Sequence, residues 1–264
     1  MHFAAFIEAG ESMQLPAKYF RNNTINTFTL IEVMLEHGVK KLVFSSTAAL
    51  YGNPKRIPIQ EVDQLEPTNP YGESKLMVER TLDWFYRKDG LYSASLRYFN
   101  AAGASANSGE DHRPESHLIP IVLQVALGQR SIVSIFGSDY PTQDGTCVRD
   151  YIHVGDLSNA HLLALEKLGG PTNSSRLVYN VGLGRGFSVR EVIDAVRRVT
   201  GHPIPCVESA RRPGDPAVLV ASPAKIKREL GWMPKYSALD TIIESAWKWR
   251  QQNPHGYTTN SGLG

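Results

Sequence analysis

The sequence has few cysteines and almost no net charge. Its 264 residues include only two cysteines, Cys147 and Cys206, which excludes a disulfide framework and does not give zinc-ligand spacing. We therefore predict no metal site. The 28 Lys and Arg residues nearly balance the 26 Asp and Glu residues, so the bulk charge does not favour a nucleic-acid partner.

Long apolar runs are also lacking. No run approaches the roughly 18 residues that a membrane-spanning helix needs, so we expect no membrane association. The first residues lack the basic stretch of a signal peptide, and Glu8 interrupts their apolar run. The hydrophobic share of 42% is enough for a buried core. Together these features predict a soluble protein of the reducing cytoplasm.

Short β-rich runs alternate with longer helical periods. The runs at 41–46, 93–99 and 177–181 are typical of buried strands, and helices are predicted at 18–37 and 71–88. This alternation predicts an α/β fold with a Rossmann-like, doubly wound parallel sheet and a smaller α/β substrate-binding domain.

Apolar residues at three- and four-residue steps define one face of each of these two helices. Both helices are predicted to end before a glycine, Gly38 or Gly90. The faces consist of Ile25, Phe28, Ile31 and Leu35 in the first helix, and of Leu76, Val78, Leu82 and Phe85 in the second.

The second half of the chain contains further helical periods and two long polar loops. Helices are predicted at about 155–168, 188–200 and 238–251. Ser188 and Glu191 have the spacing of a capping box at the start of the middle helix. The loops, at 104–117 and 137–146, are long enough to hold a ligand.

Tyr71 and Lys75 form the strongest local motif. They are four residues apart on the helix that follows Pro70, so their side chains share one face. A cation there favours the phenolate and lowers the pKa of Tyr71, as a general base requires. Taken alone, such a pair is more often part of a solvated helix face.

Hydroxyl side chains follow the predicted strand 41–46, where ligands bind in open α/β sheets. The hydroxyl of Thr47 would hydrogen-bond a substrate oxygen beside Tyr71. The alternative is a helix cap or a turn. With Lys75, these residues make a Ser/Thr–Tyr–Lys triad.

With this triad in place, the chain resembles the UDP-glucose 4-epimerase family of extended short-chain dehydrogenases/reductases. The segment 139–153 is the most specific match, and 45–52, 70–75 and 97–104 also match. Related dehydratases usually carry Asp-Glu after the strand-end hydroxyl, where this chain has two alanines, which favours epimerisation. The resemblance implies NAD-dependent, reversible 4-epimerisation of UDP-galactose and UDP-glucose through a 4-keto intermediate.

The resemblance also assigns roles. Tyr71 takes the proton of the sugar 4-hydroxyl, Lys75 lowers the pKa of Tyr71 and holds the nicotinamide ribose, and Thr47 hydrogen-bonds the 4-oxygen. The implied NAD-binding residues are Phe3, Ala4, Ala5, Asn22, Thr47, Tyr71, Lys75 and Phe99. The implied substrate-binding residues are Thr47, Tyr71, Asn100, His117, Leu118, Phe136, Arg149, Arg212 and Asp215.

Arginine forks bind phosphate oxygens bidentately, and Phe136 would pack beside uracil. Surface salt bridges and a core position are the alternative interpretations of these residues. Leu219 would crowd an N-acetyl group and so favours UDP-glucose and UDP-galactose. The open alternatives are another UDP-sugar epimerase, for N-acetylhexosamine or pentose, and an inactive UDP-sugar-binding protein.

The family pattern opens with a strand, a Gly-rich turn and a helix. The Gly-rich segment 182–186 lies in the substrate half and is interpreted as a loop. We expect about 70–80 residues of the pattern to be absent, with weak NAD binding and a tendency to aggregate. Residues 1–100 would be the remainder of the NAD-binding domain, with a return near 130–182, and 101–264 mainly the UDP-sugar-binding domain. The family often dimerises through the helices matching 18–37 and 71–88.

Overall fold

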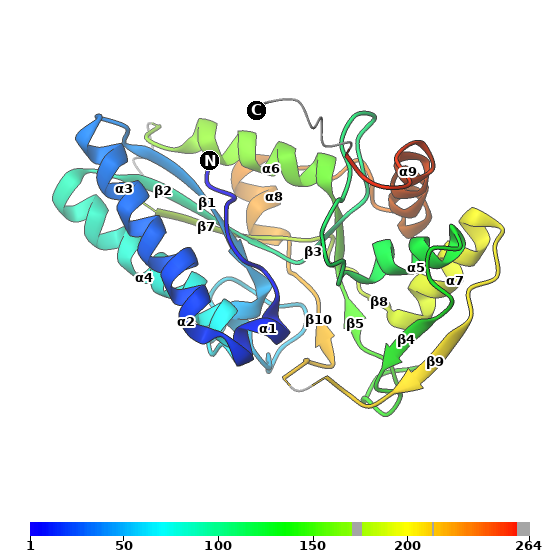
Figure 1. Ribbon diagram of the computed structural model, residues 1–264. Coiled ribbons are helices and arrows are strands. Elements are labelled where there is room, and N and C mark those ends of the chain that lie inside the picture. Colours follow the sequence, from blue (N-terminus) through cyan, green and yellow to red (C-terminus); the bar gives the residue numbers. More distant parts are fainter. Residues whose placement is uncertain (171–175, 213, 258–264) are drawn as a thin grey trace, which may run out of the picture.

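A parallel sheet lies at the centre of the structure, a computed structural model that describes residues 1–170, 176–212 and 214–257 (Figure 1). Its strands are β1 (Lys41–Thr47), β2 (Tyr92–Tyr98) and β7 (Arg176–Val181), in the order β1-β2-β7. His2 extends the sheet beyond β1 through a parallel bridge to Phe44. The predicted strands and their parallel arrangement are confirmed.

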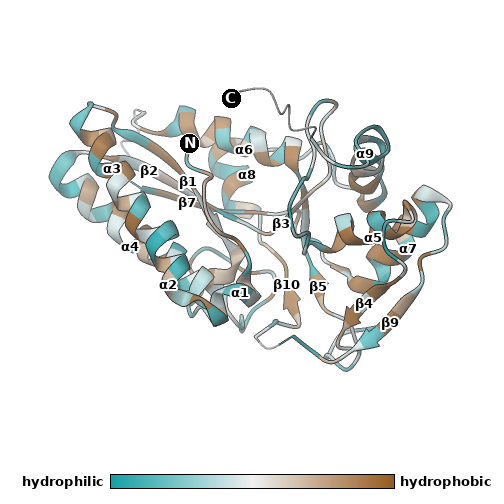
Figure 2. Ribbon diagram, viewed as in Figure 1, coloured by the Kyte–Doolittle hydropathy of each residue, from teal (hydrophilic) through white to brown (hydrophobic). Residues whose placement is uncertain are grey.

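Helices cover both faces of this sheet. α3 (Asn26–Glu36) and α4 (Pro70–Asp89) lie on one face, and α6 (Val154–Lys167) and α8 (Ala224–Leu230) on the other (Figure 1). Successive residues of β1 point to opposite faces, so Leu42 and Phe44 join the first apolar cluster and Val43 joins the second. The strands between these helices are largely buried and contain both hydrophobic and polar residues (Figure 2). The expected doubly wound arrangement is therefore confirmed.

The first predicted helix has an irregular start. It consists of α2 (Pro16–Tyr19), a π-helical turn η1 (Phe20–Ile25) and α3. The prediction that Ile25 belongs to the buried face is wrong, because its side chain is 56% exposed whereas Ile31 is fully buried. A π-helical turn contains more residues than an α-helical turn and so rotates the apolar face.

The ends of α4 follow the predicted pattern. The Asn69 side chain accepts a hydrogen bond of 2.9 Å from the backbone of Gly72, and Pro70 occupies the first turn. Gly90 ends the helix in the left-handed conformation, with φ of 71°. Leu76, Val78 and Leu82 are buried, as their spacing predicts.

A third apolar cluster forms the core of the other half. α5 (Leu118–Ala126), α7 (Val189–Thr200) and α9 (Leu239–Gln252) contribute to it, and the capping box of Ser188 and Glu191 begins α7. Short strands frame these helices: β3 (Asn100–Ala102) with β6 (Tyr151–His153), β4 (Val133–Phe136) with β9 (Cys206–Ser209), and β10 (Val218–Leu219) with β5 (Val148–Arg149) and β8 (Phe187–Ser188).

The remaining short elements are α1 (Ala9–Gln14) and the 3-10 turn η2 (Ala48–Tyr51). Over the part of the chain that the structure describes, no helix is both long and apolar enough to cross a membrane.

A buried ion pair ties α4 to the sheet. The Arg97 guanidinium on β2 donates hydrogen bonds of 3.0 and 2.7 Å to the two carboxylate oxygens of Glu79 on α4. Ser46, at the end of β1, donates a 2.6 Å hydrogen bond to the same carboxylate. Arg97 also donates to the Tyr51 hydroxyl, which donates to Asn180 on β7. These bonds hold all three strands and α4 together beside Thr47.

Glu79→Ala should lower the free energy of unfolding by about 3–5 kcal/mol, because it leaves the Arg97 charge buried without a partner. Glu73→Ala is the matched control, since Glu73 is on the same helix and its pair with Arg80, at 3.8 Å, is exposed. It should cost less than about 1 kcal/mol. Urea unfolding measures both, and equal losses would contradict the assignment.

Candidate active site

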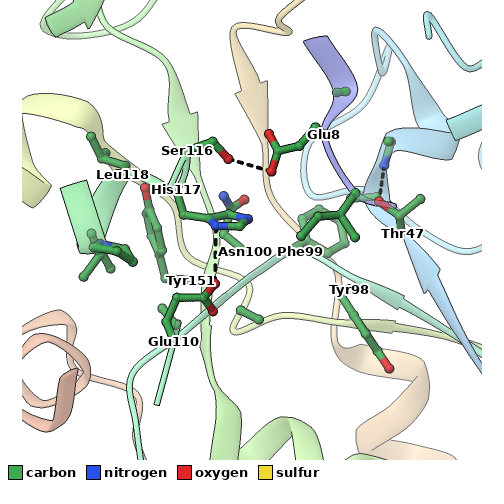
Figure 3. A pocket seen from close by; sticks show the side chains of 18 of the residues that line it. Glu8, Thr47, Tyr98, Phe99, Asn100, Glu110, Ser116, His117, Leu118 and Tyr151 are labelled. Carbon is green, nitrogen blue, oxygen red and sulfur yellow. Dashed lines mark hydrogen bonds and ion pairs between the residues drawn. The ribbon is translucent and has the colours of Figure 1, made fainter. Parts of the chain in front are cut away.

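The carboxyl ends of β1 and β2 open into a cavity of about 810 Å³. Thr47 ends β1 and Tyr98 ends β2, and both line the cavity (Figure 3). Its opposite wall comes from the loop before α5 and from the segment that leads into β10. The cavity therefore lies where open α/β sheets bind ligands, between the two apolar cores.

The structure brings most of the predicted substrate-binding residues together. The predicted residues that line the cavity are Thr47, Tyr71, Phe99, Asn100, His117, Leu118, Arg212, Asp215 and Leu219. The predicted residues outside its wall are Phe3, Ala4, Ala5, Asn22, Lys75, Phe136 and Arg149.

Close packing of α4 against η2 places Tyr71 beside Thr47. A Cβ at Gly72 would lie 2.7 Å from the carbonyl oxygen of Ala49, so only glycine permits this approach. The Thr47 hydroxyl accepts a 3.1 Å hydrogen bond from the Ala49 backbone, as the capping alternative predicts. Thr47 also forms a hydrogen bond that acts to lower the pKa of Tyr71. The hydroxyl therefore has both a capping contact and a contact with Tyr71.

Burial dominates the electrostatics of Tyr71 and Lys75. Burial raises the pKa of Tyr71, and the nearby charge of Glu8 adds to this effect. The lowering of this pKa that the sequence assigns to Lys75 therefore stays a prediction. Lys75 donates a 2.9 Å hydrogen bond to the Ser45 carbonyl and lies 4.9 Å from the Phe44 ring centroid. Burial also lowers the pKa of Lys75 itself to about 8.

Lys75 has unused hydrogen-bonding capacity. An ammonium group offers three donors, and the Ser45 carbonyl is its one hydrogen-bond acceptor among the residues that the structure describes. Because Lys75 is only 3% exposed, water has little access to the donors that the protein leaves unused. The remaining donors suit the hydroxyl groups of a bound ribose.

A carboxylate of this protein binds backbone N–H groups of the Gly-rich segment 182–186. The buried side chain of Asp150 accepts hydrogen bonds of 2.7 and 2.9 Å from the backbones of Leu183 and Gly184. It accepts another of 3.1 Å from Ala221. These N–H groups are therefore not available to a phosphate, and the interpretation of this segment as a loop is confirmed.

An arginine marks the far end of the cavity. The Arg212 guanidinium lies 4.0 Å from the ring centroid of Phe136, and it has no carboxylate partner among the described residues. Arg149 forms an ion pair with Asp215, which lines the cavity. Arg212 is therefore the arginine free to bind an anion, while Arg149 holds a cavity residue.

Sequence reasoning missed several cavity residues. Glu8, Tyr98, Glu110 and Ser116 all line the wall. The polar loop 104–117 was the available signal for two of them, and its predicted role at a ligand site is supported by its place in the wall.

The second polar loop, 137–146, makes contacts with other parts of the protein. It contributes no lining residue among those described. Instead, Asp144 contacts Ser188 at the start of α7, and Asp139 pairs with Arg211 at 2.7 Å. These side chains therefore make contacts within the protein, and the role of the loop in holding a ligand stays a prediction.

Comparisons with known proteins agree on one group of relatives. A family profile described as GDP-mannose 4,6 dehydratase matches residues 1–245. A protein of Halalkalibacterium halodurans named UDP-glucose 4-epimerase is 58% identical over 263 residues, which are 99% of this chain and 78% of the relative.

Solved structures give the same result. The UDP-glucose 4-epimerase from Bifidobacterium longum, in complex with NAD⁺ and UDP, has a TM-score of 0.90 at 42% identity over 97% of this chain and 77% of that one. The UDP-Glc/GlcNAc 4-epimerase from Campylobacter jejuni has a TM-score of 0.78 at 46% identity, over 95% and 76% of the two chains.

The lowered pKa of Lys75 predicts a pH-dependent stability. Between about pH 8 and pH 10 the unfolded chain keeps the Lys75 proton and the folded chain does not, so the free energy of unfolding rises with pH. The rise is on the order of 3 kcal/mol at most. Lys75→Met should remove it, and Lys88→Met, exposed on the same helix, should not. Denaturant unfolding at several pH values measures this, and a rise that persists in Lys75→Met would contradict the prediction.

Proposed function

The chain belongs to the UDP-glucose 4-epimerase family, and we propose that it interconverts UDP-galactose and UDP-glucose with NAD as cofactor. The observation that carries this proposal is the cavity itself. A tyrosine and a threonine hydroxyl in mutual contact occupy one side, and an arginine without a carboxylate partner among the described residues occupies the other. A UDP-sugar needs this arrangement, because the two hydroxyl side chains can contact the sugar hydroxyl that is oxidised while the arginine binds the diphosphate.

Tyr71 and Thr47 handle the 4-hydroxyl of the sugar. Tyr71 accepts the proton of this hydroxyl as the 4-keto sugar forms. Thr47 hydrogen-bonds the same oxygen and keeps it beside Tyr71. When the reaction reverses, Tyr71 returns the proton. Since the cavity volume of about 810 Å³ is near the upper end of ordinary ligand sites, a keto sugar has room to turn over in it.

The residues present fit the nicotinamide end of NAD. Lys75 offers its unused donors to the ribose hydroxyls, and Phe99 lines the cavity. NAD bound there would supply the hydride acceptor for C4 of the sugar and the hydride donor for the keto sugar. We also assign Phe3, Ala4, Ala5 and Asn22 to the cofactor side, outside the wall of the substrate cavity.

The opposite end fits UDP. Arg212 binds the diphosphate, and Phe136, which its guanidinium covers, packs beside uracil. Arg149 acts through Asp215 by fixing that carboxylate. Asn100, His117 and Leu118 complete the wall around the sugar nucleotide.

The residues after Thr47 favour epimerisation over dehydration. Ala48 and Ala49 line the cavity there and bring no proton donor or acceptor in their side chains. A dehydratase needs an acid and a base at this point to remove water from the sugar.

The two halves of the chain bind different ligands in this proposal. We assign residues 1–100, with a return near 130–182, to NAD and residues 101–264 mainly to the UDP-sugar. We place the protein in the cytoplasm, because its two cysteines are unpaired, and cell fractionation tests this location.

Tyr71→Phe should reduce the turnover of UDP-galactose by roughly 10²–10⁴-fold, because it removes the general base. Tyr86→Phe is the matched control, since Tyr86 is on the same helix and packs against Tyr92, away from the cavity. The assay uses NAD⁺ in excess, and circular dichroism verifies that both variants fold. Full activity in Tyr71→Phe would contradict the mechanism.

Leu219 governs the space beside the sugar ring. It lines the cavity from β10, so its branched side chain excludes an N-acetyl group. Leu219→Ala should raise kcat/KM for UDP-N-acetylglucosamine relative to UDP-glucose by roughly tenfold or more. Leu162→Ala, exposed on α6, serves as the control. Equal use of both substrates by the unmodified chain would contradict this assignment.

We propose a homodimer in which α3 and α4 of two copies pack as a bundle. Both helices expose large apolar side chains, Leu30 and Val33 on α3 and Met77 and Trp84 on α4. Val33→Glu should shift sedimentation from dimer to monomer, whereas Leu162→Glu should not. A monomer before substitution, or a dimer that survives Val33→Glu, would contradict this interface.

A further inference from the structure

Three potential metal ligands lie close together in the loop before α5. Ring nitrogens of His112 and His117 each lie 3.7 Å from the same carboxylate oxygen of Glu110. The ligand atoms of the three residues all lie within 4.8 Å of one another. Figure 3 shows the His117 ring directed toward Glu110 across the cavity wall.

These distances suit a bound ion. Two ligands at about 2.1 Å from a tetrahedral ion lie roughly 3.4 Å apart. The 3.7 Å spacing between His112 and Glu110 needs to shorten by only a few tenths of an ångström. Glu110 and the two rings are partly exposed, so rotation of their side chains closes the remaining separation.

Two further carboxylates hold the histidine rings in place. Buried Glu115 lies 2.9 Å from Nδ1 of His117 and accepts hydrogen bonds from the backbones of Ser116 and His117, which leaves Nε2 as the ligand atom of this ring. Glu8 lies 3.4 Å from Nε2 of His112 and accepts a 2.7 Å hydrogen bond from Ser116. Carboxylates that contact a ring nitrogen orient metal-binding histidines and raise their basicity.

We propose that Glu110, His112 and His117 bind a divalent transition-metal ion such as Zn²⁺ or Co²⁺. Two imidazoles and one carboxylate are a ligand set for these ions, whereas Mg²⁺ and Ca²⁺ prefer oxygen ligands alone. The lack of paired cysteines predicted no metal site, but this ligand set requires no cysteine.

Occupancy of the site acts on the cavity. His117 and Glu110 line it, whereas His112 does not. A bound ion would draw both lining residues together and occupy the wall beside Leu118. Resting on the proposed function, this means that the ion lowers the turnover of UDP-sugars.

A Co²⁺ titration of the full chain tests the site without any substrate. The expected result is visible absorption bands that saturate at one ion per chain and disappear on addition of Zn²⁺. His112→Ala should abolish the bands. His37→Ala, which removes an exposed histidine at the end of α3, should keep them. Absence of the bands in the unmodified chain, or their persistence in His112→Ala, overturns the proposal.

The effect on turnover is tested separately. Micromolar Zn²⁺ should inhibit UDP-galactose turnover of the unmodified chain and should not inhibit His112→Ala, whose turnover without Zn²⁺ stays normal. Equal inhibition of both proteins overturns the blocking role. Since the Co²⁺ titration needs no catalysis, a failure of the epimerase assignment and a failure of the metal site give different results.

Discussion

The site depends on how closely α4 approaches the end of β1. Gly72 brings the first turn of the helix against the Ala49 carbonyl, and this contact sets Tyr71 beside Thr47. Two turns later, the carboxylate of Glu79 holds Ser46 on β1 and Arg97 on β2. The helix is thus fixed at both points against the strand that carries the threonine, so the hydroxyls of Thr47 and Tyr71 are positioned by buried structure rather than by a loop.

This burial has an electrostatic consequence. Burial disfavours both the phenolate of Tyr71 and the ammonium of Lys75. It therefore raises the pKa of the tyrosine and lowers the pKa of the lysine, so that the neutral form of each side chain is favoured. The Thr47 hydrogen bond works against this for the tyrosine. A proton leaving Tyr71 therefore needs a nearby positive charge, and the Lys75 ammonium stabilises the phenolate only if it remains protonated.

How much the sequence predicts differs between the two halves. The long helices and buried strands of the first sheet have clear periods, and the glycine at the end of α4 marks its boundary. Strands of two to four residues, such as β5 and β10, have no period to detect and exist because tertiary contacts hold them. Ile25 shows the same limit, since a π-helical turn changes the helix register without any signal in the apolar pattern.

The sequence motif at Thr47 and Tyr71, and the family resemblance at Arg212, placed these three residues at one site, and all three line the cavity. The candidate site was not predictable where the role depends on three-dimensional proximity. Glu8 and Ser116 are far apart in sequence, yet their side chains hydrogen-bond at 2.7 Å across the cavity wall. Spacing also does not reveal which arginine is free, because the partner of Arg149 comes from a distant segment.

Asp150 explains how two separate cores produce one cavity. Its carboxylate takes the backbone donors of the Gly-rich loop and of Ala221, just after β10. Its own backbone bonds to Asn100, after β2, and to Leu219 on β10. The end of the first sheet and the wall that carries Leu219 are therefore fixed to the same buried residue. A shift of either half would break buried hydrogen bonds that water cannot replace. These bonds therefore keep Tyr71 and the wall that carries Leu219 at a fixed separation.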